Sequence, residues 1–346
     1  MELADTLSML CSLNGPAGFE SPVAVRVKEL LTPYMDEVGI DVMGNVIAVK
    51  RSGTQNAPKV LLDAHMDEIG LIITGVEEGF LRFSALGGLD ARIMPAAEVE
   101  ILSDPPHIGI ICALPPHVLK AEDKNKQIKF EDMYIDVGMS QEQAAKAIPL
   151  GTPGVMSCSP RRCGADLICA KALDDRAGVA AILKAVELLA ETKPEADLYV
   201  MASAQEEVGI RGAGPGAFGI SPDYCIVVDV DFAKTPDTKP HEASSALGGG
   251  VIISRGPNMN PELTDSITAL AKEKGISSQI TVTPGGNSGT NARAIQISRE
   301  GVATAVLGIP LKYMHTSAEI ASLRDIESAA MLICETVKSL KGGTAG

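Results

Sequence analysis

Aromatic residues are scarce in this chain, which has no tryptophan, six phenylalanines and five tyrosines in 346 residues. Proteins that bind single-stranded nucleic acid stack the bases on aromatic side chains, so this composition disfavours that class. A formal net charge of −14 also opposes binding to phosphate backbones and to anionic membrane surfaces. We therefore expect no nucleic acid and no membrane as a partner, and we interpret most of the excess acid as solvated surface.

Long hydrophobic runs and a targeting signal are also missing. The apolar stretches 69–74 and 302–309 are too short to span a bilayer, and the N-terminus carries acids where a secretory signal would carry lysine or arginine. The seven cysteines include no CxxC pair. Cys158, Cys163 and Cys169 cluster, but their spacing fits neither a zinc knuckle nor a redox motif. The sequence predicts reduced thiols in a cytoplasmic protein.

Hydrophobic patterning predicts an α/β protein, and the length predicts two domains. A helix is expected after Ser21 as its N-cap, with Pro22 at the first helical position, and apolar runs indicate buried strands at 45–49 and 60–64. Strands and helices alternate after residue 167, as in a layered α/β sheet. The strands are expected at 198–202, 225–230, 249–253, 279–282 and 303–307, and the helices at 175–190, 261–274, 289–297 and 325–338.

The segment 68–163 has a different texture. Short apolar stretches at 69–74, 81–83, 97–102 and 108–111 are separated by glycine and proline. One helix is expected at 140–148, where Ser140 and Gln143 form a capping box, and 122–129 is predicted to be a polar loop. We interpret 68–163 as a small β-rich module inserted into a domain that is formed by residues 1–67 and 164–346.

Five short segments place histidines or carboxylates at predicted strand ends or turns: DAHMDEIG, ALDDRAG, AQEEVGIRGA, IVVDVDF and YMHTSAE. Functional groups of open α/β sheets collect where strands end. Two imidazoles, several carboxylates and a spare acid for proton transfer meet the needs of a two-metal hydrolase. Because no cysteine is among them, catalytic Zn²⁺, Co²⁺ or Mn²⁺ fits better than a structural zinc. The candidates are His65, Asp67, Asp174, Glu206, Glu207, Asp229 and His315.

The first three candidates each have a structural alternative. Asp67 is suited to orient His65 as a metal ligand, although the two residues could equally form a turn hydrogen bond. Asp174 is placed to bridge two cations, whereas Asp175 is typical of a helix N-cap. The adjacent Glu206 and Glu207 would divide into one ligand and one general base for a metal-activated water, whereas an arbitrary pair of acids is more often simply solvated.

The later segments are weaker when each is taken alone. Asp229 lies inside an apolar run, where an unpaired carboxylate is costly and a cation would offset that cost, but Asp231 competes with it. A single histidine in a loop is more often structural, so the assignment of His315 depends on the other segments. The loop 285–290 resembles an anion-binding turn without the lysine of a P-loop, and it is equally a substrate-lining loop or a plain connection.

These residues resemble the TET-type aminopeptidases, also called glutamyl or deblocking aminopeptidases, a family of co-catalytic metallopeptidases. The similarity runs from GPAGFE through GNVIAVK, AHMDEIG, LGGLDARIMP, LDDRAG and QEEVGIRGA to MHTSAE. The resemblance implies one metal held by His65 and Asp229, a second held by Glu207 and His315, and Asp174 as the bridge.

The resemblance also implies that Glu206 is the general base, that Asp67 orients the histidine of the first metal, and that the Asp174–Asp175 peptide bond is cis. It implies an α/β catalytic domain interrupted by a β-rich dimerisation domain, with dimers assembled into hollow dodecamers that admit short peptides. Two departures stand out. Family members often carry a small or polar residue at the position of Asp231. Some have Gly-Thr-Asp where residues 289–291 of this chain are Gly-Thr-Asn, and we expect the change at Asn291 to affect substrate preference.

The sequence therefore predicts a metal-dependent aminopeptidase that removes N-terminal residues from short peptides. Three alternatives remain at this stage. A di-metal deacylase of N-acyl amino acids would use the same centre, and a non-catalytic scaffold would use the metals only to stabilise an assembly. A glycosidase would need two carboxyls roughly 5–9.5 Å apart on either side of a sugar bond, which adjacent Glu206 and Glu207 fit poorly.

Overall fold

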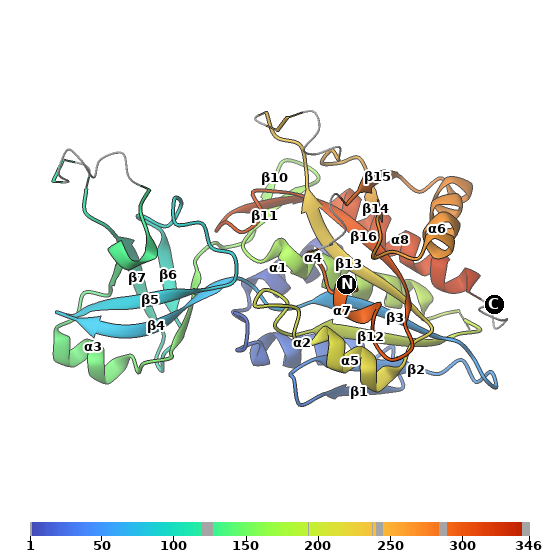
Figure 1. Ribbon diagram of the computed structural model, residues 1–346, viewed down its shortest axis with the longest axis horizontal. Helices are drawn as coiled ribbons and strands as arrows, with labels where there is room; N and C mark the ends of the chain where they lie inside the picture. Colours follow the sequence, from blue (N-terminus) through green and yellow to red (C-terminus); the bar gives the residue numbers. More distant parts are fainter. Residues whose placement is uncertain are drawn as a thin grey trace.

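The computed structural model contains a large mixed sheet covered by helices and a separate small barrel (Figure 1). It describes residues 2–115, 117–118, 127–192, 194–236, 238–239, 245–283 and 289–340. The predicted loops 122–129 and 285–290 lie mostly outside the described residues. Among the described helices, none has the length and apolar character needed to cross a bilayer.

The large sheet has the order β1-β2-β12-β3-β13-β16-β17-β11-β10, with β14 paired to β16 and β15 to β14. Its centre is parallel, because β12, β3, β13 and β16 pair in that orientation. The bounds are β1 (Glu37–Ile40), β2 (Val46–Lys50), β3 (Lys59–His65), β10 (Arg161–Cys163), β11 (Leu167–Ala170), β12 (Asp197–Ser203), β13 (Tyr224–Phe232), β14 (Val251–Arg255), β15 (Ser278–Val282), β16 (Ala303–Lys312) and β17 (Glu319–Ser322).

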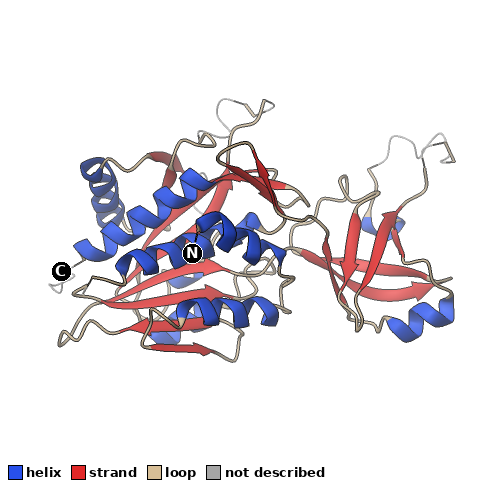
Figure 2. Cartoon of the chain, turned by 180° about the vertical axis from the view of Figure 1, so that it is seen from behind, coloured by secondary structure: helices blue, strands red, loops and turns tan. Residues whose placement is uncertain are grey.

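Helices cover both faces of this sheet, as Figure 2 shows from behind. Successive side chains of a strand point to opposite faces, so Ile226 and Val228 of β13 pack in one core and Cys225 and Val227 in another. The first core includes side chains of α1 (Leu3–Ser12), α2 (Ser21–Leu31), α4 (Leu173–Leu189), α6 (Pro261–Lys274) and α8 (Leu323–Ser339). The second includes those of α5 (Ala213–Ile220) and α7 (Ala292–Ile295). Burial on both faces explains the continuous apolar runs of the central strands.

The barrel is closed in the order β4-β5-β8-β7-β6-β9 and has a hydrophobic core of its own. Its strands are β4 (Gly70–Glu77), β5 (Phe80–Leu86), β6 (Glu98–Ile101), β7 (His107–Cys112), β8 (Tyr134–Asp136) and β9 (Pro153–Met156). The capping box predicted for α3 (Gln141–Ala147) is confirmed, because Ser140 Oγ accepts from the Gln143 backbone and Gln143 Oε1 accepts from the Ser140 backbone. The domain division into 1–67 plus 164–346 and 68–163 stays a prediction.

Some elements differ from the sequence-based expectation. Ser21 is the first residue of α2 and Glu20 is its N-cap, so the predicted cap was wrong. The helix expected at 289–297 is a single turn, Ala292–Ile295. β1, α1 and α5 were not predicted. Three glycines and a proline in the sequence of α5 are typical of a loop, and its helical form depends on packing against the sheet through Ala217 and Ile220.

Candidate metal centre

Four neighbouring parallel strands end at the same edge of the large sheet and carry most of the predicted site residues there. His65 is the last residue of β3, and Asp229 lies near the end of β13. Glu206 and Glu207 follow β12, and His315 follows β16. Because the carboxyl ends of parallel strands share one edge of a sheet, these side chains are brought together by topology.

Asp174 reaches this edge from the beginning of α4 and lies between the two histidines. His65 Nε2 is 3.0 Å from Asp174 Oδ1, and His315 Nε2 is 3.2 Å from Asp174 Oδ2. On the outer sides, His315 Nε2 is 3.4 Å from Glu207 Oε1, and His65 Nε2 is 4.0 Å from Asp229 Oδ1. One carboxylate with an imidazole on each oxygen is the arrangement expected of a ligand that bridges two cations.

The centre contains two groups of three residues, and within each group the potential ligand atoms all lie within 4.8 Å of one another. One combines His65, Asp175 and Asp229, and the other combines His65, Asp174 and Glu207. The predicted cis peptide bond between Asp174 and Asp175 is confirmed. Asp175 was expected to be a helix N-cap, but it lies inside the bounds of α4 with non-helical backbone angles, and its Oδ1 accepts from the Gly178 backbone at 2.9 Å.

The charges of the centre fit divalent cations. Burial raises the pKa of Glu206 to about 7, and burial also raises the pKa of Glu207 and, by a large amount, that of Asp229. Hydrogen bonds to Asp174 and Glu207 raise the pKa of His315 to about 11. In the absence of metal, protons on the carboxyls and imidazoles therefore offset the negative charge of the buried carboxylates. A pair of bound cations would balance this negative charge instead.

A second observation supports the fit. Asp175 Oδ2 is buried and has no hydrogen-bond partner among the described residues. Buried polar atoms are ordinarily paired, because an unpaired one costs about 1–3 kcal/mol. A cation beside His65, Asp175 and Asp229 would satisfy this oxygen, so the residues present suit a metal ion.

Asp67 contacts the backbone of two residues of the centre and the imidazole of a third. Its Oδ1 accepts from the Glu206 backbone at 3.0 Å, and its Oδ2 accepts from the Glu207 backbone at 3.1 Å. His65 Nδ1 lies 3.4 Å from Asp67 Oδ1 and 3.1 Å from the Asp67 backbone oxygen. Asp67 is therefore placed to orient the imidazole, and it also fixes the backbone of both glutamates, which the sequence did not reveal.

Glu319 is a residue of the centre that the sequence analysis missed. It is buried, with 2% of its surface exposed, and it accepts hydrogen bonds from the backbones of Asp174 at 3.1 Å and His315 at 2.9 Å. With Thr316 and Met156 it lines a small cavity against the metal centre. The only sequence signal was its place in YMHTSAE, an acid that opens an otherwise apolar strand.

Two residues singled out as departures from the family pattern lie elsewhere. Asp231 is in neither group of potential ligands, whereas Asp229 is in one, and Asp231 Oδ2 accepts from Thr281 Oγ1 at 3.4 Å. Asn291 is buried, and its amide donates to Asp63 at 2.9 Å and Ser203 at 2.7 Å. An effect of Asn291 on substrate preference stays a prediction.

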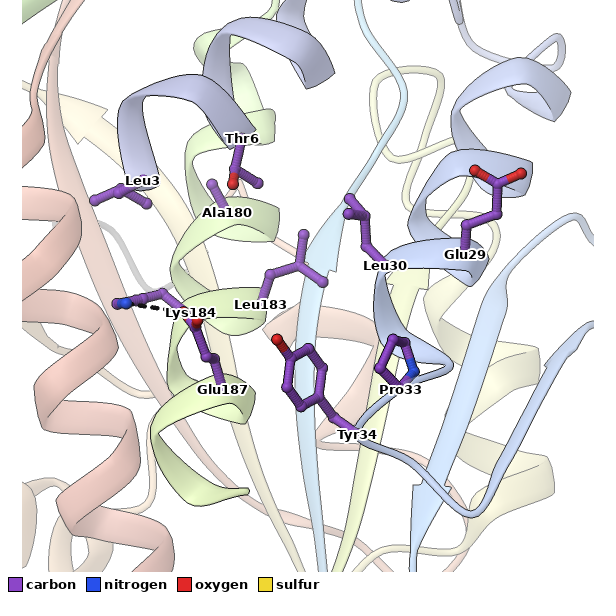
Figure 3. Close-up of a pocket in the computed structure, with 10 residues that line it drawn as sticks. All are labelled: Leu3, Thr6, Glu29, Leu30, Pro33, Tyr34, Ala180, Leu183, Lys184 and Glu187. Carbon is purple, nitrogen blue, oxygen red and sulfur yellow. Dashed lines mark hydrogen bonds and ion pairs between the residues drawn. The ribbon is translucent and has the colours of Figure 1, made fainter. Parts of the chain in front are cut away.

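A larger cavity of about 180 Å³ lies between α1, α2 and α4, away from this edge of the sheet (Figure 3). Leu3, Leu30, Tyr34 and Leu183 line it, and Lys184 forms an ion pair with a neighbouring glutamate at its rim. It contains none of the candidate ligands, whereas Asp174 and Glu207 line the smaller cavity at the metal centre.

Comparison with known families identifies the fold and the chemistry. The model of the M42 glutamyl aminopeptidases matches residues 44–332. The chain belongs to this family. A lysyl aminopeptidase of Pyrococcus furiosus is 36% identical over 334 residues, which cover 94% of each chain.

Solved structures of M42 relatives superpose over nearly the whole chain. A TET aminopeptidase from a marine-sediment Thaumarchaeota archaeon has a TM-score of 0.94 at 31% identity, covering 99% of this chain and 97% of that one. The TET1 peptidase of Pyrococcus horikoshii, which can assemble into a tetrahedron or a large octahedral shell, has a TM-score of 0.85 at 29% identity and covers 98% and 100%.

Membership in the M42 family confirms the resemblance inferred from the motifs. The chain is an aminopeptidase, a hydrolase of peptide bonds, and metal dependence is expected for the family. The mixed α/β sheet agrees with the TET structures, and the clusters of acidic and histidine side chains are suited to bind metal.

Proposed function

We propose that this M42 aminopeptidase removes N-terminal residues from short peptides with two divalent metal ions, Zn²⁺ or Co²⁺ with Mn²⁺ as a further candidate. His65 and Asp229 would hold one ion, and Glu207 and His315 the other. Asp174 would bridge them. The observation that carries the proposal is the Asp174 carboxylate, which lies 3.0 Å from one imidazole and 3.2 Å from the other.

When bound, the two ions would lower the pKa of a water molecule and stabilise the oxyanion that forms at the scissile carbonyl. Glu206 is the general base in this proposal. Its backbone is fixed by Asp67, and none of the described residues donates a hydrogen bond to its carboxylate. Burial, which raises its pKa to about 7, suits a group that accepts a proton from water and returns it to the leaving amine.

Assembly and domain roles are part of the same proposal. TET relatives form large homo-oligomeric shells, and we extend this to dimers of the present chain, joined through the barrel of the 68–163 module and arranged as a dodecamer. Such a shell would admit short peptides and exclude folded proteins. A cytoplasmic location stays a prediction.

The test is a panel of aminoacyl chromogenic substrates, assayed with Zn²⁺ or Co²⁺ and then with a chelator. We expect metal-dependent cleavage that Glu206→Gln lowers by about 10²–10⁴-fold, because glutamine cannot accept the proton. Metal binding must remain intact in this variant for the result to count. Hydrolysis of N-acyl amino acids without cleavage of free-amine substrates would favour the deacylase, and full activity in Glu206→Gln would remove its role as base.

A further inference from the structure

Two buried carboxylates of the centre make the same kind of contact. Asp67 accepts the backbone N–H groups of Glu206 and Glu207, one on each oxygen. Glu319 does the same for Asp174 and His315, with Oε2 on the first and Oε1 on the second. Each carboxylate thus joins the backbones of two residues whose side chains point into the metal centre.

The place of Glu319 in the fold explains how one side chain reaches both. It is the first residue of β17, which pairs with β11 at Ala170 and with β16 near Lys312. β11 leads into Asp174, and the segment after β16 carries His315. Glu319 therefore lies where two otherwise independent chain segments converge.

The His315 segment depends on such an anchor. Both Tyr313 and His315 have positive φ values, 62° and 61°, a backbone conformation that costs non-glycine residues free energy. The hydrogen bond from the His315 backbone to Glu319 is the contact that ties this turn to the sheet. This backbone contact adds to the direct contact between His315 Nε2 and Asp174 Oδ2 at 3.2 Å.

We propose that Glu319 is a positioning residue that sets the spacing between Asp174 and His315, and thereby the affinity for the second metal ion. The inference rests on the proposed function, since it takes these two residues as ligands. Outer groups that fix metal ligands typically change affinity by about 10–100-fold when they are replaced. Glu319 contacts the backbone of His315 directly but reaches the first ion only through the bridging Asp174, so the first ion should be weakened less than the second.

Glu319→Gln is the sharpest variant. The amide keeps one oxygen for one backbone N–H but presents an NH₂ donor to the other, so one of the two contacts is lost with little change in volume. Glu319→Asp is a second variant, which keeps the charge but is one methylene too short to span both N–H groups. It keeps the inference testable where glutamine in this buried position prevents folding.

Asp325→Asn is the matched control. Asp325 is also a fully buried carboxylate that accepts two backbone N–H groups, those of Gly248 and Gly250, each at 2.7 Å. It is outside both groups of potential ligands. If losing a buried carboxylate that accepts two backbone N–H groups lowers stability in general, Asp325→Asn should show that loss. It should not change the spacing between the proposed metal ligands.

The experiment is a Zn²⁺ titration of the full-length apoprotein in competition with a chromophoric chelator. We expect two tight sites in the wild type and in Asp325→Asn. In Glu319→Gln and Glu319→Asp we expect one site weakened about 10–100-fold and the other weakened less. The inference about Glu319 would be overturned if both Glu319 variants bound Zn²⁺ like the wild type, or if Asp325→Asn weakened Zn²⁺ binding equally. Either result would leave the proposed metal centre in place. A wild type without two zinc sites would instead remove the proposed metal centre, and this inference with it.

Discussion

Asp174 keeps its negative charge in a buried setting because both imidazoles hydrogen-bond to it. Burial opposes that charge, but contacts with His315 and His65 hold the pKa of Asp174 well below its usual value. Each partner in turn holds its proton more tightly than a free imidazole. Metal ions and protons therefore compete for the same nitrogen atoms, so metal affinity should rise with pH as these protons are lost.

A glycine from outside the sheet limits the space of one of these imidazoles. A Cβ added at Gly88 would lie 2.5 Å from His315 Nδ1 and 2.9 Å from Cε1, so the ring would have to move. We expect Gly88→Ala to lower kcat/KM and the affinity for the second zinc ion by about tenfold or more. Gly219→Ala is the control, since a Cβ at that position in α5 meets nothing within 4 Å. Wild-type zinc binding in Gly88→Ala would contradict the placement of His315.

At the scale of secondary structure, the sequence predicted what depends on local pattern. The apolar run 225–230 corresponds to β13, and the helix at 261–274 matches α6, whose N-cap Asn260 and C-terminal Gly275 are strong local signals. His65 was predictable because it is a polar residue at the end of a buried strand, and Asp229 because it is a carboxylate inside an apolar run. Elements and residues of this kind can be predicted from local sequence pattern.

Other elements depend on contacts that are distant in the chain. α5 is helical despite its glycines because the sheet offers a surface to pack on. Glu319 contacts the Asp174 backbone from 145 residues away, and no spacing rule relates the two positions. The position of Asp174 before a predicted helix suggested its bridging role, and the resemblance assigned the role of base to Glu206 rather than Glu207. The contacts of Asp67 with the backbones of both glutamates became visible only in the hydrogen bonds of the folded chain.

At the scale of the whole molecule, the barrel offers an apolar outer surface. Ile108 and Ile110 of β7 are 55% and 43% exposed, while Gly109 between them is buried. Phe80 of β5 and Leu150 are also exposed on this module. These exposed side chains suit the dimer contact proposed for the barrel, although exposed hydrophobic side chains such as Val42 and Phe218 also occur outside this module.

Ile108→Asp is expected to disrupt that dimer, because it places a charge in an apolar contact. Light scattering should give about 430 kDa for the wild type, twelve copies of the 36.1 kDa chain, and a smaller species for the variant. Val42→Asp is the control, a fully exposed apolar residue on the large sheet side of the chain. An unchanged mass in Ile108→Asp would place the contact elsewhere.

The most direct test of the two-metal account is anomalous diffraction at the zinc edge from crystals grown with Zn²⁺. The account predicts two peaks with the Asp174 carboxylate between them, one about 2.0–2.2 Å from ligand atoms of His65 and Asp229 and the other from those of Glu207 and His315. A single peak, or peaks away from these residues, would contradict it.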